Sequence, residues 1–224
     1  MLDIAANIAR LQAELPAGVR LVAVTKTRTA QEVRQAYGAG LRDFAESRIQ
    51  EAGAKQADLA DLTDICWHFI GHLQSNKAKK ALEQFQWLHT CDRLELALRL
   101  DRLAGERRCR PQVCLQVKVR PDPDKYGWSP AALQADFPQL LACQHLHWAG
   151  LMTILPLGLP EAAALEAFQD VVALRDRLRQ QSREPRALPE LSMGMSGDYR
   201  LALQAGATMV RLGQALFGPR SPQA

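Results

Sequence analysis

The chain has 224 residues, of which 47% are hydrophobic and 23% are charged, and its formal net charge is +4. This composition is typical of one globular domain large enough to bury a substantial core, and it excludes disordered and collagen-like chains. The positive charge is small and scattered along the sequence, so we expect no nucleic-acid partner.

Strand-like and helix-like segments alternate along the whole chain. After a first helix over residues 2–15, apolar and β-branched runs predict strands at 19–25, 43–45, 67–70, 87–90, 113–119, 148–154, 190–192 and 208–212. Helical segments follow them at 29–37, 47–59, 75–85, 92–104, 129–141, 160–179 and 198–204, and a short turn begins at 214. Asp92 and Ser129 are the expected N-caps of two of these helices.

Eight strand-then-helix units predict an α/β fold, a single closed (β/α)8 TIM barrel. An open doubly wound sheet is the weaker alternative, because no GxGxxG fingerprint follows the first strand. No linker divides the chain. We therefore assign residues 1–218 to one domain and residues 219–224 to a flexible C-terminal tail.

No apolar run approaches the roughly 20 residues needed to cross a bilayer. The first ten residues carry Asp3 and lack the basic start and apolar centre of a secretory signal. The five cysteines have no CxxC spacing, which predicts neither a disulfide framework nor a zinc site. We therefore expect a cytoplasmic protein with reduced cysteines, no membrane contact and no bound metal.

Lys26 ends the most apolar predicted strand, and function in a barrel collects at the carboxyl ends of the strands. An amine buried there has its pKa lowered, which makes it a nucleophile able to form a Schiff base. The alternative is a lysine whose amine extends from the strand end into solvent. Position alone favours that alternative, since a barrel has eight such ends.

Residues 192–198 (SMGMSGD) join a predicted strand to a helix and combine two hydroxyls with two glycines. Glycine lets backbone N–H groups approach a ligand, and a helix N-terminus favours anions, so this segment is a candidate phosphate cradle. The alternative is an ordinary helix start with Ser196 as the cap and Asp198 favoured by the helix dipole. Residues 211–213 (RLG) add an arginine and a glycine after the last strand, beside this loop.

The histidines carry weaker signals. His68 lies inside a predicted strand, where a hydrogen-bonded core histidine is the expected role. His72 follows that strand but has no evident acidic partner, and His89 is expected at a strand edge. No HExxH, paired-carboxylate or nucleophile-elbow motif is present, so we predict no catalytic residue.

Four separated segments carry a resemblance to a known family: 21–27 (LVAVTKT), 67–77 (WHFIGHLQSNK), 191–198 (LSMGMSGD) and 207–218 (ATMVRLGQALFG). In these segments the chain resembles the pyridoxal phosphate homeostasis proteins. The resemblance implies a single-domain barrel similar to the N-terminal domain of alanine racemase, the type III fold of pyridoxal phosphate (PLP) proteins. It also implies PLP held covalently as an internal aldimine with Lys26.

By position, the resemblance implies nine cofactor-binding residues: Lys26, Ser47, Met152, Ser192, Gly194, Met195, Ser196, Arg211 and Gly213. Ser196, the backbone of 194–195 and Gly213 would hold the phosphate. Arg211 would face the pyridine nitrogen or help to hold the phosphate. An arginine at that nitrogen keeps it unprotonated and weakens the ring as an electron sink.

One segment departs from the family pattern. After the second strand the family reads Phe-Gly-Glu-Asn, whereas this chain reads Phe44-Ala45-Glu46-Ser47. Ser47 is shorter and lacks the amide that an asparagine could direct to the ring. We also expect Ala45 to restrict this stretch, because alanine disfavours a left-handed backbone.

The implied function is a PLP-binding protein that buffers or delivers the cofactor and maintains vitamin B6 and amino-acid homeostasis without substantial catalysis. PLP-dependent apoenzymes are the implied partners, and a monomer is the implied state. One alternative is a small PLP-dependent amino-acid racemase, for which Tyr126 is the tyrosine to test as a second base. Another is a phosphosugar barrel enzyme that uses Lys26 on a carbonyl substrate.

Overall fold

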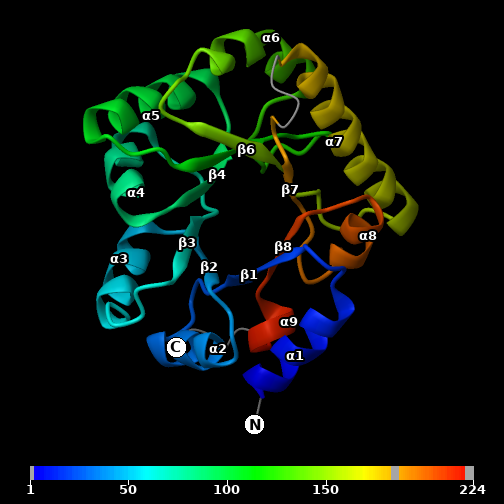
Figure 1. Cartoon of the computed structure of the whole chain (residues 1–224). Helices are drawn as coiled ribbons and strands as arrows, with labels where there is room; N and C mark the ends of the chain where they lie inside the picture. The colour runs from blue at the N-terminus through cyan, green and yellow to red at the C-terminus, as the bar shows by residue number, and fades with distance from the viewer. Residues whose placement is uncertain (1–2, 183–186, 220–224) are drawn as a thin grey trace.

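Eight parallel strands close into one barrel in the computed structural model, which describes residues 3–182 and 187–219. The strands follow chain order around the barrel (Figure 1): β1 (Arg20–Val24), β2 (Asp43–Glu46), β3 (Cys66–Phe69), β4 (Trp87–Cys91), β5 (Gln112–Gln116), β6 (His147–Met152), β7 (Glu190–Ser192) and β8 (Met209–Leu212). Strand β8 pairs with β1, which completes the ring. The predicted barrel is confirmed. The start of the first predicted helix and the tail beyond 219 lie outside the described residues.

Helices surround the barrel (Figure 1): α1 (Ile4–Glu14), α2 (Ala30–Gly38), α3 (Ile49–Asp58), the 3-10 turn η1 (Ser75–Lys77), α4 (Ala78–Gln84), α5 (Leu94–Arg107), α6 (Pro130–Leu141), α7 (Glu161–Gln181), α8 (Tyr199–Gln204) and α9 (Gln214–Phe217). The helix predicted over 75–85 is therefore divided, because its first turn is wound more tightly. Among the described helices, none is both long and apolar enough to span a bilayer.

The two predicted N-caps have different outcomes. Ser129 accepts a hydrogen bond from the Ala132 N–H and precedes Pro130, so this cap is confirmed. The cap predicted at Asp92 is wrong, because α5 begins at Leu94 and its N-cap residue is Arg93. The Asp92 carboxylate instead forms hydrogen bonds with the side chains of His72 and Arg93.

Side-chain alternation along the strands divides the interior into two regions. The larger core lies between the strands and the helices and contains outward residues such as Leu21 and Ala23. Inside the barrel lies a separate apolar cluster: Trp87, Cys114, Ala149, Met152 and Met209. This inner cluster leaves room beside it for buried polar residues.

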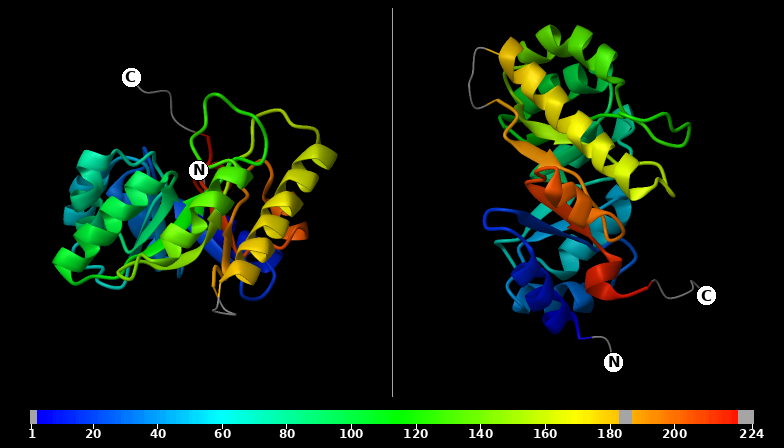
Figure 2. Two further views of the ribbon diagram at one scale, coloured as in Figure 1. Left: turned by 90° about the horizontal axis from the view of Figure 1, so that it is seen from above. Right: turned by 90° about the vertical axis from the view of Figure 1, so that its right-hand side faces the viewer.

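The connections at the two ends of the barrel differ in length. The connection from β5 to α6 spans residues 117–129 and projects beyond the face at which the strands end (Figure 2, left, green). At the opposite face the chain enters β1, β2 and β3 after shorter turns. The end with the longer connections is the one where a barrel of this kind places its site.

Candidate functional site

Lys26 lies in a tight turn directly after β1. The Thr25 carbonyl accepts a hydrogen bond from the Arg28 N–H at 2.9 Å, and Thr27 has a φ of 66°. A left-handed backbone at a β-branched residue persists only where its surroundings hold it in place. The Thr25 hydroxyl points away from the barrel axis toward Glu46, at 2.7 Å. Alternation therefore directs the half-buried Lys26 toward the mouth of the barrel.

A buried ion pair behind the strands anchors this turn. The Lys55 ammonium on α3 donates to the Glu46 carboxylate at 2.5 Å and to the Thr25 carbonyl at 2.7 Å. The Lys55 side chain is 10% exposed and that of Glu46 is 0% exposed. The pair fixes Thr25 and, through it, the position of the next residue. Sequence reasoning missed this pair, because Lys55 has the appearance of an ordinary helix-surface lysine.

The glycine-containing loop after β7 is close-packed and requires glycine at one position. Gly194 has a φ of +92°, and a Cβ there would lie 2.7 Å from the Ala202 Cβ, so only glycine fits. The alternative interpretation of this loop, a helix start capped by Ser196, does not hold, because Asp198 is the N-cap residue of α8. The Asp198 carboxylate accepts from the Met195 N–H at 2.6 Å and so faces its own loop.

The loops after β7, β8 and β1 meet at one end of the barrel. The Ser196 hydroxyl accepts a hydrogen bond from the Ala215 N–H in α9 at 3.2 Å. A Cβ on Gly213 would lie 3.4 Å from the Val24 carbonyl, which precedes Lys26 by two residues. The structure thus brings the predicted lysine and both glycine-containing loops together.

Arg211 is a buried cation beneath these loops. Its guanidinium donates to the Ser192 hydroxyl at 2.7 Å and to the Thr153 carbonyl at 2.9 Å. Burial lowers the pKa of Arg211 to about 10, so the side chain remains protonated at neutral pH. No carboxylate in the described part of the chain forms an ion pair with it. An uncompensated buried cation favours an anionic or electron-rich ligand.

A chain of hydrogen bonds crosses the barrel interior and ends on this arginine. Asp43 bonds to Nε2 of His68 at 2.8 Å, and Nδ1 of His68 bonds to Nε2 of His89 at 2.9 Å. Nδ1 of His89 bonds to the Ser192 hydroxyl at 2.8 Å. His68 is thus the hydrogen-bonded core histidine that the sequence predicted. His89 is not at a strand edge as expected: it is fully buried inside the barrel.

The two residues at the ends of this hydrogen-bond chain, Asp43 and Arg211, determine which atoms within it carry the protons. Arg211 can only donate hydrogen bonds, and an ionised Asp43 can only accept them. Burial lowers the pKa of both His68 and His89, so both rings are neutral at pH 7. Every bond therefore runs in one direction: Ser192 donates to His89, His89 to His68, and His68 to Asp43. All four side chains are satisfied, and Arg211 is held in a fixed orientation.

The remaining predicted site residues lie at or below the same end. Met152 is fully buried in the inner apolar cluster. Ser47 follows β2, and a Cβ on Gly71 would lie 2.0 Å from its carbonyl oxygen, so the ends of β2 and β3 are in close contact. Ala45 lies within β2 and has no positive φ, so the restriction expected from it does not arise.

Tyr126 and His72 form a pair at this end of the barrel. Their rings stack with centroids 3.6 Å apart, and the Tyr126 side chain is 55% exposed. Nδ1 of His72 lies 3.0 Å from the Asp92 carboxylate, which also accepts from Arg93 at 2.6 Å. His72 thus has the acidic partner that no local sequence pattern revealed, because Asp92 comes from the next strand-to-helix loop.

This end of the barrel therefore presents a primary amine, a buried guanidinium and closely packed glycine loops. A small phosphorylated carbonyl compound matches this set, because an amine attacks a carbonyl carbon and backbone N–H groups bind phosphate. PLP is one such compound.

The chain is similar to known proteins in both sequence and structure. The family model described as alanine racemase, N-terminal domain, matches residues 2–221. The pyridoxal phosphate homeostasis protein of Synechocystis is 53% identical over 208 residues, which is 93% of this chain and 94% of that protein. PipY of Synechococcus elongatus, solved with PLP bound, is 50% identical with a TM-score of 0.92, over 96% of this chain and all of that chain. Alanine racemase of Clostridium difficile shares the fold, with a TM-score of 0.80 at 13% identity over 99% of this chain and 57% of that one.

Proposed function

The chain belongs to the pyridoxal phosphate homeostasis protein family, and from this premise we propose that it binds PLP at the carboxyl end of the barrel and buffers or delivers it. The observation that carries the proposal is the meeting of Lys26, the two glycine loops and the buried Arg211 at one end of the barrel. The relative with PLP bound, at 50% identity over nearly the whole chain, supports it. When bound, PLP supplies an aldehyde for covalent attachment and a ring able to withdraw electrons.

Lys26 is the residue we assign to covalent attachment. Lys26 would hold the cofactor through a bond between its amine nitrogen and the aldehyde carbon, with the aldehyde oxygen released as water. The turn that fixes Lys26 serves this step, because the amine must approach one carbon from one direction. The anchoring pair of Glu46 and Lys55 lies outside the barrel and takes no part in the chemistry.

The loops after β7 and β8 are assigned to the phosphate group. Ser196 offers a hydroxyl, and Gly194 and Gly213 offer backbone that can approach an anion closely. The Met195 N–H, which donates to Asp198, would exchange that partner for the anion. The Asp198 carboxylate occupies this N–H at 2.6 Å, so phosphate binding would require it to turn away from the loop. Ser47 and Met152 complete the assigned contacts to the ring.

Arg211 is assigned to the pyridine nitrogen. The hydrogen-bond chain through Ser192, His89 and His68 keeps the guanidinium oriented. A cationic donor at that nitrogen prevents its protonation, so the ring becomes a poor sink for electrons. The site therefore favours holding the cofactor over stabilising a carbanion, which fits a homeostasis role with little turnover.

In this proposal the chain works as a monomer in the cytosol and passes PLP to PLP-dependent apoenzymes. A small amino-acid racemase is the second candidate, and the pair of Tyr126 and His72 is the observation that favours it. An exposed tyrosine beside a histidine oriented by a carboxylate is a possible second acid–base group at the mouth of the barrel. The two functions differ in whether a D-amino acid is produced.

The absorption spectrum of the freshly purified protein tests the proposal. We expect a visible band from the Schiff base, absent in Lys26→Ala and present in the control Lys125→Ala, whose lysine lies in the β5-to-α6 connection. A colourless wild-type protein that stays colourless with added PLP would contradict PLP binding and favour the phosphosugar enzyme. The same band in Lys26→Ala would show that attachment occurs elsewhere.

A further inference from the structure

The opposite end of the barrel contains a second cluster of chemically active side chains. A cavity of about 500 Å³ opens there, lined by the first residues of seven strands, including Arg20, Asp43, Cys66, Trp87 and Glu190. It lies at the start of the strands, whereas Lys26 and the glycine loops lie at their ends. The proposed cofactor site does not use this cavity.

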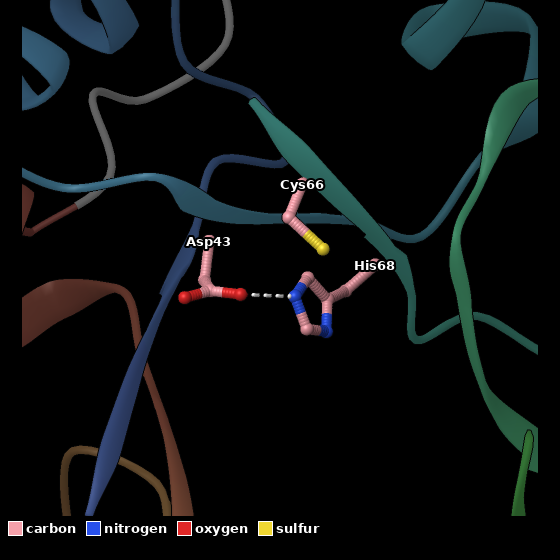
Figure 3. A group of neighbouring side chains, drawn as sticks. All are labelled: Asp43, Cys66 and His68. Carbon is pink, nitrogen blue, oxygen red and sulfur yellow. Dashed lines mark hydrogen bonds and ion pairs between the residues drawn. The ribbon is translucent and has the colours of Figure 1, made fainter. Parts of the chain in front are cut away.

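Strand register brings three metal-binding residue types together in it. Strands β2 and β3 pair with Asp43 opposite Cys66, and His68 lies two residues further along β3 on the same face. The carboxylate, the thiol and the imidazole point toward one another (Figure 3), and their ligand atoms all lie within 4.8 Å of one another. In the part of the chain that the structure describes, this is the one such group.

We propose that Asp43, Cys66 and His68 bind a divalent transition-metal ion of the zinc class. A thiolate, an imidazole and a carboxylate together match the preferences of Zn²⁺ and exclude Mg²⁺ and Ca²⁺, which take oxygen ligands. The Asp43 oxygen and Nε2 of His68 are hydrogen-bonded at 2.8 Å, and as two ligands of one tetrahedral ion they would separate to about 3.3 Å, a small movement. Three protein ligands leave a fourth position open toward the cavity. This inference does not depend on the proposed PLP function.

The imidazole is oriented in advance, as in established metal sites. The His68 ring stacks on Trp87 with centroids 5.4 Å apart and planes 15° from parallel. Its other nitrogen is held by His89. The Cys66 side chain is only half-buried and 23% of the Asp43 side chain is exposed, so an ion can enter from the cavity.

Metal binding requires a defined movement of protons. The Cys66 thiol releases its proton to solvent. The ion displaces the proton on Nε2 of His68, while Nδ1 of that ring takes up the proton that Nε2 of His89 had donated to it. The displaced proton is taken up on Nδ1 of His89, so both rings stay neutral, and His89 donates it to the Ser192 oxygen, which has a second lone pair available. The Ser192 hydroxyl loses its acceptor in this arrangement, a cost that the coordination bonds must exceed.

Arg20 is the group that opposes the ion. Its guanidinium lies 3.8 Å from the Asp43 carboxylate and over the Trp87 ring at 4.9 Å. A fixed positive charge there weakens the binding of a cation. Replacing it with a neutral side chain should therefore strengthen metal binding, a result that a purely structural role of the cluster would not produce.

Titration of the purified protein with Zn²⁺, followed by calorimetry, tests the site, and Co²⁺ serves as a spectroscopic probe of the thiolate. We expect one ion per chain, a thiolate-to-cobalt charge-transfer band, and at least about tenfold weaker binding in Cys66→Ser and Asp43→Asn. Cys109→Ser, which removes a cysteine outside the cavity, should bind as the wild type does. Arg20→Gln should bind several-fold more tightly.

Three results would overturn the proposal. One is the absence of stoichiometric Zn²⁺ binding by wild type and Arg20→Gln alike. Another is equal binding by wild type, Cys66→Ser and Asp43→Asn, with circular dichroism showing that both variants are folded. Loss of the cobalt band in Cys109→Ser would likewise place the metal at a different cysteine.

Discussion

The buried pair of Lys55 and Glu46 gives a sharp test of how the barrel fixes its lysine. In Lys55→Met the Glu46 carboxylate stays fully buried but loses its cation, and only the Thr25 hydroxyl remains to donate to it. The Thr25 carbonyl also loses a donor at 2.7 Å. The change therefore affects both the stability of the fold and the turn that carries Lys26.

The size of the effect follows from burial. Removing one partner of a buried ion pair costs about 3–5 kcal/mol, because the other charge remains buried and uncompensated. The Lys55 and Glu46 side chains are 10% and 0% exposed, so this buried case applies. A domain of this size is stable by about 5–15 kcal/mol and shifts its Tm by about 2–4 °C per kcal/mol. We therefore expect Lys55→Met to unfold roughly 6 to 20 °C below the wild type.

Urea unfolding and thermal melting of three variants measure this. The double variant Lys55→Met with Glu46→Gln removes both charges and should recover most of the loss. Arg34→Met breaks the exposed pair with Asp61 and should change stability far less. Retention of PLP by Lys55→Met should also fall. A loss for Lys55→Met no greater than for Arg34→Met, or no recovery in the double variant, would refute the reasoning.

The other predictions concern the retention of PLP, catalytic turnover, and the stability of the fold at acid pH. Arg211→Met and Ser196→Ala should each weaken PLP retention, since hydrogen bonds involving a charged group contribute about 1.5–3 kcal/mol. Pyridoxal without phosphate should bind far more weakly than PLP. Equal affinity for both compounds would argue against the phosphate site in the loops after β7 and β8. Incubation with L-alanine in deuterated water should yield no appreciable D-isomer by chiral analysis; turnover of about 1 per second or more, lost in Tyr126→Phe, would establish the racemase. Burial lowers the pKa of His68 and His89 below the ordinary 6.5, so the unfolded chain binds protons that the folded chain does not. The free energy of unfolding should therefore be retained above pH 6.5 and fall below it, by up to about 1.4 kcal/mol per pH unit for each histidine, and a flat urea-unfolding profile from pH 7.5 to 5.5 would contradict this.

Local patterns in the sequence were sufficient to predict the order of the elements. The strands of the barrel are mostly buried on both faces, so several of them, such as β1 and β6, appear as short apolar runs, and each following helix has its own periodicity. Ser129 and Pro130 marked a helix start because a cap depends only on neighbouring residues. Position after a strand also marked Lys26 and the loops after β7 and β8 as candidates, but for Lys26 position alone favoured a lysine extending into solvent, and its assignment came from the resemblance to the family.

The pairing of side chains across the barrel required the tertiary structure. Asp92 was predicted to cap its own helix but bonds to His72, and Ser196 contacts α9 in place of the start of α8. Lys55 resembled a surface lysine until α3 was packed against β2. In each case a polar group chooses its partner by distance in space, which local sequence does not encode.

The sequence by itself determined that this chain forms a barrel with an amine and two glycine loops at the strand ends. Only the tertiary structure showed that Asp43, His68, His89 and Ser192 form one series of hydrogen bonds that ends on Arg211. These residues come from five different strands, and the closure and register of the barrel decide which inward side chains meet. Because burial makes an unpaired polar group costly, each inward polar side chain must find a partner, and only the closed barrel provides it.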